Sequence, residues 1–158
     1  MSNEVQHEID ALISSLKSVQ LATLNAEHQA NISYAPYLKR GEAFYIFISE
    51  LASHTQNLKL NPKLSLMFIE DEVKSKTVFA RQRLILECNS HVITKDEKQW
   101  EVILAELENA QGPTIKLLKS LPDFCLFQLT PEKGSFVKGF GQAFKLSGEQ
   151  LTNIAQVK

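Results

Sequence analysis

The sequence predicts a mainly β fold with added helices (α+β), arranged as a small and mainly antiparallel barrel in one domain of 158 residues. Roughly six or seven strand-like runs follow one another, separated by polar, glycine or proline residues. Only a few helical patterns interrupt them, whereas a doubly wound α/β fold would alternate strand and helix more regularly. No linker or internal repeat divides residues 1–158, so a single domain is expected.

The chain is expected to open with an amphipathic helix over residues 1–17. Val5, Ile9 and Leu12 recur at helical spacing, which places them on one face. The runs "VQLATL" and "NISYAPYLKR" then predict two strands. Pro36 in the second run favours a strand edge or a bulge, because proline cannot donate a hydrogen bond to the ladder.

The next run, "AFYIFI", is apolar at every position, which predicts a strand covered on both faces. Ser53 and Gln56 then match a Ser-x-x-Gln capping box at the start of a short helix. That helix is expected to end near the Asn-Pro pair that follows, because the residue before proline disfavours helix. "KLSLMFIED" predicts a further strand, and "TVFARQRLILECNSHVIT" predicts a long one.

A second capping box, Thr94-x-x-Glu97, opens the next predicted helix, which a Gly-Pro pair ends. The run "TIKLLKSL" adds one more short helix. The strand "DFCLFQLTP", a turn at "EKG" and a strand-like run over 135–146 come after it. A C-terminal segment over 147–158 completes the chain.

The run "SFVKGFGQAFKL" contains two glycines but neither nucleotide-binding glycine pattern, because strand-like residues flank the glycines on both sides. Strand alternation would place the glycines on one face and three phenylalanines on the other. We therefore expect the glycines to allow a bend or the close approach of another surface. The residues concerned are Gly139 and Gly141, and Phe136, Phe140 and Phe144.

Composition argues against several classes of function. The formal net charge is −1, from 17 basic and 18 acidic residues, so a general nucleic-acid binder is not expected. The apolar runs are much shorter than the ~20 residues of a membrane span, and the acidic N-terminus lacks the order of a signal peptide. A cytoplasmic protein with no membrane partner is expected. Cys88 and Cys125 are expected as free thiols, and no metal-binding motif is present.

Arg81 and Arg83 are the first candidate site residues. In a continuous strand, residues two apart share a face, so both guanidinium groups would point the same way. Two such groups repel each other unless an anion or a carboxylate lies between them, and arginine suits phosphate and carboxylate groups. An anionic ligand and pairing with surface glutamates both remain open at this point.

The corner "ASHTQNL" and the start of the run "DFCLFQL" hold the other candidates. Ser53, His54 and Thr55 would lie in the first turn of a helix, where free N–H groups favour anions. His54 is also consistent with an ordinary structural imidazole, which is the more common role of a lone histidine at such a position. Asp123 follows Pro122 at the entry to a strand, a position where aspartate usually makes a local turn.

The sequence resembles the bacterial haem iron utilisation proteins in four stretches: "LATLNAEHQANISYAPYL", "HTQNLKLNPKLSLMFIEDE", "FARQRL" and "LPDFCLFQLTPEKGSFVKGFGQAF". These proteins belong to the wider pyridoxamine-5'-phosphate-oxidase-like group of flavin-binding split barrels. The resemblance implies a six-stranded antiparallel Greek-key split barrel that forms a homodimer, with ligand sites at the subunit interface. Better-known members bind haem and, with reductant and oxygen, are linked to its degradation.

By matched motif, the resemblance implies that Arg83 lies near the haem and that His54 lines the same pocket. Arg83 would act on the haem propionates or on oxygen at the iron. Asp123 would hydrogen-bond the histidine that ligates the iron. In the haem-binding relatives that histidine lies in a C-terminal tail, a little beyond the segment that matches 147–158, whereas no histidine follows His91 in this sequence.

A flavin alternative follows from the wider group. FMN would bind at the dimer interface, with its phosphate near Arg81 and Arg83. The flavin oxidases carry an Arg-Lys pair beside the serine of the matching corner, where this chain has Ser53-His54-Thr55. Three hypotheses stay open: a haem-binding protein of haem iron utilisation that also degrades haem, an FMN-dependent oxidoreductase, and a non-catalytic haem carrier.

Overall fold

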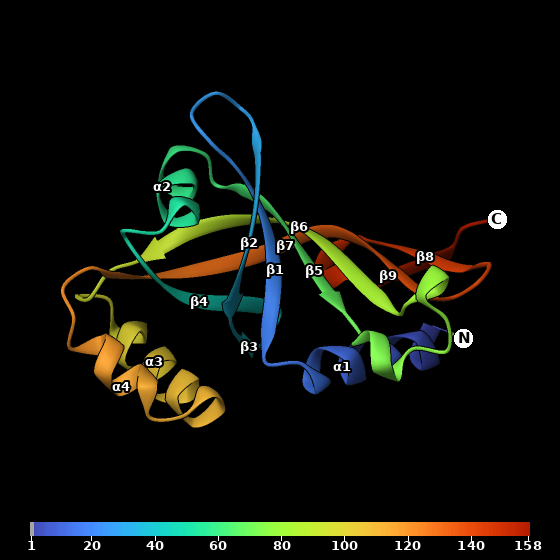
Figure 1. The fold of residues 1–158 in the computed structure, drawn as a ribbon. Coiled ribbons are helices and arrows are strands. Elements are labelled where there is room, and N and C mark those ends of the chain that lie inside the picture. The colour runs from blue at the N-terminus through green and yellow to red at the C-terminus, as the bar shows by residue number, and fades with distance from the viewer. Residues whose placement is uncertain (1) are drawn as a thin grey trace.

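A curled antiparallel sheet makes up most of the molecule in the computed structural model, which describes residues 2–158 (Figure 1). Four α-helices lie beside it: α1 (Ser2–Ser15), α2 (Ser53–Leu60), α3 (Lys98–Gln111) and α4 (Thr114–Lys119). The strands are β1 (Ser18–Leu24), β2 (Ala30–Pro36), β3 (Leu38–Arg40), β4 (Ala43–Ser49), β5 (Lys63–Ile69), β6 (Arg83–Ile93), β7 (Phe124–Gly139), β8 (Gln142–Ser147) and β9 (Asn153–Gln156). The short 3₁₀ turns are η1 (Glu72–Lys74), η2 (Val78–Ala80) and η3 (Glu149–Leu151).

The strand order closes the sheet into a barrel. The order is β2-β1-β5-β6-β7-β4-β3, and only Tyr37 separates β2 from β3 in the chain. Because β2 pairs with β1 and β3 pairs with β4, this bent pair of strands belongs to both ends of the sheet. Counted as one strand, it completes a ring of six, and the predicted antiparallel split-barrel fold is confirmed. The hairpin β8–β9 extends from the second half of β7.

Strand β4 is buried on both faces, as its unbroken apolar run predicts. Phe44 and Ile46 face the barrel interior, while Tyr45 and Phe47 belong to a second core beneath α3. Trp100 of α3 packs edge-on against Phe47, with ring centroids 6.4 Å apart. Helices α3 and α4 therefore cover the outside of the barrel where β4 pairs with the start of β7 (Figure 1).

The N-terminal helix, predicted over 1–17, spans Ser2–Ser15, and its apolar face joins the barrel core. The hydroxyl of Tyr37 donates to the carbonyl oxygens of Ile13 and Leu16 at the end of this helix. Within residues 2–158, no helix combines the length and the apolar character needed to cross a membrane.

The two predicted capping boxes differ from the structure. Helix α2 has Ala52 at its N-cap with no side-chain cap, and Gln56 donates from Nε2 to the carbonyl oxygen of Glu50 over 2.8 Å. In the second capping box, one of the two expected hydrogen bonds forms: the backbone N–H of Thr94 donates to Oε2 of Glu97 over 2.7 Å. Helix α3 begins at Lys98, so its N-cap is Glu97 and not the predicted Thr94.

Two predictions about the later strands are wrong. No turn occurs at "EKG", since β7 continues through it for 16 residues. The turn lies instead at Phe140–Gly141, where Gly141 has φ +66° and the flanking Gly139 and Gln142 pair across the hairpin. Phe140 is consequently exposed at the tip, apart from the buried pair Phe136 and Phe144.

The long predicted strand after residue 76 is shorter than expected. The chain first forms the 3₁₀ turn η2, and β6 begins only at Arg83. Arg81 therefore lies before the strand, and the predicted shared strand face of Arg81 and Arg83 does not form. Tight turns and strands accept the same residues here, so alternation alone does not separate them.

Candidate functional site

His54 lies in the first turn of α2 and faces strand β2. Its Nδ1 is 2.8 Å from Oγ of Ser33, within hydrogen-bonding distance, and its ring is half-buried. Burial lowers the pKa of the imidazole below its ordinary value, because desolvation disfavours the charged form. Burial therefore favours the neutral form of the imidazole, and its Nε2 has no hydrogen-bond partner among residues 2–158.

Thr55 and Ser53, the neighbours of His54, differ in their surroundings. Thr55 is fully buried, and its hydroxyl donates to the carbonyl oxygen of Ser49 over 2.5 Å. This bond ties the start of α2 to the end of β4. Ser53 is exposed at the first position of the helix.

Asp123 lies at the same corner of the molecule, immediately before β7. Its Oδ2 accepts a hydrogen bond from Oγ of Ser49 over 3.2 Å, and its backbone carbonyl accepts one from the N–H of Glu50 over 2.6 Å. The end of β4 thus brings Asp123 close to the start of α2, although the two lie about 70 residues apart in the sequence. We call this region, made by Ser49, His54, Thr55 and Asp123, the α2 corner.

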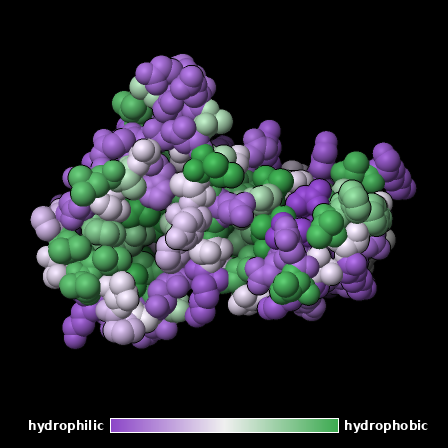
Figure 2. All heavy atoms as spheres, viewed as in Figure 1, coloured by the Kyte–Doolittle hydropathy of each residue, from purple (hydrophilic) through white to green (hydrophobic). Residues whose placement is uncertain are grey.

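An apolar depression of about 350 Å³ opens beside the α2 corner. Figure 2 shows hydrophobic residues gathered on this side of the molecule, between α2 and helices α3 and α4. A mostly apolar hollow with a few polar groups at its rim is the usual form of a small-molecule site. Its lining includes Tyr34, Phe47, Ser49, His54, Leu118 and Phe124.

The two arginines lie elsewhere, at the start of β6. The guanidinium of Arg81 donates from Nε and Nη2 to the carbonyl oxygen of Glu70 over 3.0 and 2.6 Å. Arg81 therefore stabilises the loop between β5 and β6. Arg83 donates from Nη1 to the carbonyl oxygen of Arg81 over 3.1 Å. Its other N–H groups have no protein acceptor within residues 2–158, and these can bind an anion.

Arg83 and Asp123 lie at opposite ends of the β6–β7 ladder. Arg83 pairs with Val137 near the end of β7, whereas Ile93 at the other end of β6 pairs with Leu126, close to Asp123. Ile93 lies ten residue steps along the strand from Arg83, which is roughly 30 Å at about 3.3 Å per step. In Figure 1, β6 runs from the side of η2 and β8 to the side of α3. One chain therefore does not bring Arg83 into the α2 corner.

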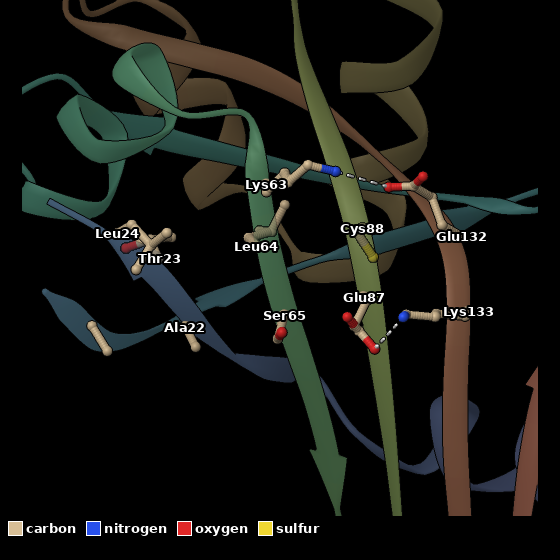
Figure 3. A pocket seen from close by; sticks show the side chains of 11 residues that line it. Ala22, Thr23, Leu24, Lys63, Leu64, Ser65, Glu87, Cys88, Glu132 and Lys133 are labelled. Carbon is tan, nitrogen blue, oxygen red and sulfur yellow. Dashed lines mark ion pairs between the residues drawn. The ribbon is translucent and has the colours of Figure 1, made fainter. Parts of the chain in front are cut away.

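A larger hollow, of about 630 Å³, lies on strands β1, β5, β6 and β7 (Figure 3). Its charged residues pair with one another: Lys63 with Glu132 at 3.9 Å, and Lys133 with Glu87 at 3.8 Å. Buried Cys88 lies in its wall. The sequence does not indicate this hollow, because it forms where strands distant in the chain meet at a register shift after Glu87. Across the described residues, no group of three or more His, Cys, Asp or Glu side chains is placed to hold a metal ion.

Comparison with known proteins identifies the family. The family model described as pyridoxamine 5'-phosphate oxidase matches residues 5–138. Haem oxygenase HutZ of Vibrio cholerae is 38% identical over 158 residues, which cover all of this chain and 90% of that protein.

Comparison with solved structures supports the same family assignment. ChuZ of Campylobacter jejuni superposes with a TM-score of 0.89 at 37% identity and covers 98% of this chain, while this chain spans 63% of ChuZ. The structure of HutZ, described as a haem storage protein of Vibrio cholerae, has a TM-score of 0.76 at 38% identity and covers 79% of this chain and 88% of HutZ. A haem-binding protein of Mycobacterium smegmatis shares the fold at 23% identity, with a TM-score of 0.78 over 89% of this chain and 57% of that one. This chain therefore belongs to the pyridoxamine 5'-phosphate-oxidase-like split-barrel family and, within it, to the haem utilisation group of HutZ and ChuZ.

Proposed function

We propose that this protein binds haem at the interface of a homodimer and serves haem iron utilisation in the cytoplasm. The observation that carries the proposal is the 38% identity with haem oxygenase HutZ over the whole of this chain. The free thiols Cys88 and Cys125 fit a reducing compartment.

The α2 corner fits one side of a haem. A porphyrin is flat and apolar, and Tyr34, Phe47 and Phe124 in the depression offer it aromatic contacts. Neutral His54 presents its free Nε2 at the rim, and imidazole is a common protein partner of haem. Bound haem would supply the iron for oxygen chemistry, while His54 and Asp123 would orient the groups around it.

Arg83 fits the propionate side of the same ligand. A guanidinium with free N–H groups binds carboxylates well. The exposed side chains of Val78 and Phe79, five and four residues before Arg83, would add apolar contact with the porphyrin edge. Arg81 would hold the loop that presents these side chains through its bonds to the carbonyl of Glu70.

The distance between Arg83 and the α2 corner supports a homodimer. Since Arg83 lies roughly 30 Å from the α2 corner along the ladder, a single haem can contact both only if they come from different protomers. A two-fold axis would place Arg83 of one protomer beside His54 of its partner and create two equivalent sites.

The outer face of the sheet supplies a surface for such a dimer. Cross-strand pairing places Tyr34, Gln20, Met67 and Ile85 in one row across β2, β1, β5 and β6. Tyr34 is 67% exposed and Ile32 beside it is 80% exposed. Apolar side chains on an uncovered sheet face are best buried against a second copy.

FMN is the second candidate ligand, because the matching family model is that of pyridoxamine 5'-phosphate oxidase and the wider group resembled by the sequence binds flavin. The candidate residues for holding it include Arg81 and Arg83 near its phosphate, and Ser53 and Thr55, but two of these four are occupied. Arg81 donates to Glu70 and the Thr55 hydroxyl donates to Ser49. Haem is therefore the better fit, and FMN titration belongs in the same experiment.

Titration of purified protein with haem tests binding directly. We expect a shifted Soret band, weakened in both His54→Leu and Arg83→Gln and unchanged in Lys145→Gln, a control on the exposed hairpin. Absence of any Soret shift, together with saturable FMN binding, would identify the ligand as a flavin and contradict the proposal of haem. Incubation of the haem complex with ascorbate and oxygen then separates a haem-degrading enzyme, which loses the Soret band, from a carrier, which keeps it.

Mixing the two variants tests the shared site. After subunit exchange, His54→Leu and Arg83→Gln protomers form heterodimers that each contain one intact site. Roughly a quarter of all sites should regain wild-type affinity. No recovery after proven exchange, or a monomer in sedimentation at micromolar concentration, would contradict the interface.

A further inference from the structure

Two polar contacts join α2 to β2 in matching order. His54 meets Ser33 at 2.8 Å, and Asn57 donates from Nδ2 to Oδ1 of Asn31 at 2.9 Å. His54 and Asn57 are three apart on the helix and share a face. Ser33 and Asn31 are two apart on the strand and also share a face. The helix thus lies along the strand with both contacts in register.

Asn57 makes a further bond that fixes this register. Its Nδ2 also donates to Oγ1 of Thr23 over 3.0 Å. Thr23 and Asn31 pair across β1 and β2, so one buried amide joins the helix to both strands. Asn57 is 6% exposed and Thr23 is 2% exposed. Buried polar groups are costly unless paired, so the satisfied network favours one arrangement.

We propose that Ser33 and Asn57 are positioning residues, which hold the His54 ring in one orientation, with Nδ1 toward Ser33 and Nε2 toward the ligand depression. Ser33 engages Nδ1 directly, and Asn57 fixes the helix turn that carries the ring. A histidine that binds a metal centre or its ligands commonly has its other ring nitrogen held in this way. The inference rests on the proposed haem function, but the ring orientation itself is a property of the ligand-free protein.

Ser33→Ala removes the direct contact, and Ser33→Thr keeps a hydroxyl on a strand residue and should restore it. Asn57→Leu removes the contacts of Asn57 with Asn31 and Thr23. Ser90→Ala is the matched control: Ser90 is also an inward-facing strand serine, but its buried Oγ has no hydrogen-bond partner among the described residues. All four variants are first compared with wild type by urea unfolding, so that only folded protein is used.

Nuclear Overhauser contacts of the His54 ring protons in the ligand-free protein report the ring orientation, and Soret titration reports haem affinity. We expect one ring orientation in wild type, Ser33→Thr and Ser90→Ala, and a mixture of orientations in Ser33→Ala and Asn57→Leu. Haem affinity should fall between about twofold and tenfold in the latter two, the size of one net hydrogen bond. An unchanged ring orientation in folded Ser33→Ala overturns the inference. If wild type binds no haem, the proposed function fails, whereas a single ring orientation lost in Ser33→Ala still supports the positioning role.

Discussion

Oγ of Ser49 donates a hydrogen bond to Oδ2 of Asp123 over 3.2 Å, although 74 residues separate the two in the sequence. The adjacent N–H of Glu50 donates to the carbonyl oxygen of Asp123 over 2.6 Å. The contact joins the end of β4 to the start of β7. It leaves Oδ1 of Asp123 without a hydrogen-bond partner among residues 2–158 and so available to a ligand.

Asp123→Ala should therefore weaken haem binding more than it weakens the fold. Loss of the Ser49 bond is expected to lower the free energy of unfolding by about 0.5–1.5 kcal/mol, measured with urea. Soret titration measures the affinity. Asp71→Ala is the control, because Asp71 is exposed and its side chain makes no hydrogen bond. Equal haem affinity in the two variants would remove Asp123 from the site.

His54 should make stability depend on pH below about 6.5, the ordinary pKa of histidine. Burial lowers the pKa of His54 in the folded state, so the unfolded chain takes up the proton first. The free energy of unfolding should then fall as the pH drops below about 6.5, until the lower folded-state pKa is reached.

Urea unfolding between pH 5 and 7.5 measures this effect in wild type and in His54→Gln, where the slope should be smaller. His91→Gln replaces an exposed histidine and should keep the wild-type slope. A wild-type slope in His54→Gln would contradict the buried neutral imidazole.

The two thiols should differ in reactivity, because the thiolate is the nucleophile. Burial raises the pKa of Cys88 to about 12, and its side chain is 2% exposed. Burial also raises the pKa of the partly exposed Cys125, with a smaller contribution from its hydrogen bond to Glu50. Iodoacetamide at pH 8 should label Cys125 slowly and leave Cys88 unmodified, as mass spectrometry will show. Both should react in urea, and equal labelling of folded protein would contradict the structure.

Glycine substitutions should show which glycine is closely packed. A Cβ on Gly134 would lie 2.6 Å from the carbonyl oxygen of Ile85 and 2.7 Å from Cδ2 of Leu86. Gly134→Ala should cost about 2–3 kcal/mol through overpacking. Gly141 has open space around it, so Gly141→Ala should cost only about 1 kcal/mol, from its left-handed backbone. Urea unfolding measures both, and the opposite order would contradict the placement of the turn.

Local patterns predicted the elements whose burial is regular. The helical spacing of Val5, Ile9 and Leu12 predicted α1, and the unbroken apolar run "AFYIFI" predicted a strand buried on both faces. Elements that depend on backbone geometry were predicted less well. A 3₁₀ turn at Val78–Ala80 and a two-residue turn at Phe140–Gly141 interrupt runs that alternate like strands, because strand-forming residues are tolerated in both turns.

Motif resemblance singled out Arg83, His54 and Asp123 as candidates and implied one pocket for Arg83 and His54 at a subunit interface. Within one chain the strand register keeps these two residues apart, and no local pattern encodes which ends of two long strands lie together. The contacts of Ser33, Asn57 and Thr23 with α2 were missed for a similar reason. An isolated polar residue in a strand carries no signal until its partner on another element is known.

Fold class and family followed from the sequence, because hydrophobic periodicity and ordered motifs are properties of the chain alone. Which groups remain free to bind depended on the tertiary structure. Thr55 and Arg81 turned out to serve the protein's own backbone, whereas Nε2 of His54 and part of the Arg83 guanidinium did not. That distinction depends on hydrogen bonds between elements distant in the chain, which form only when the barrel closes.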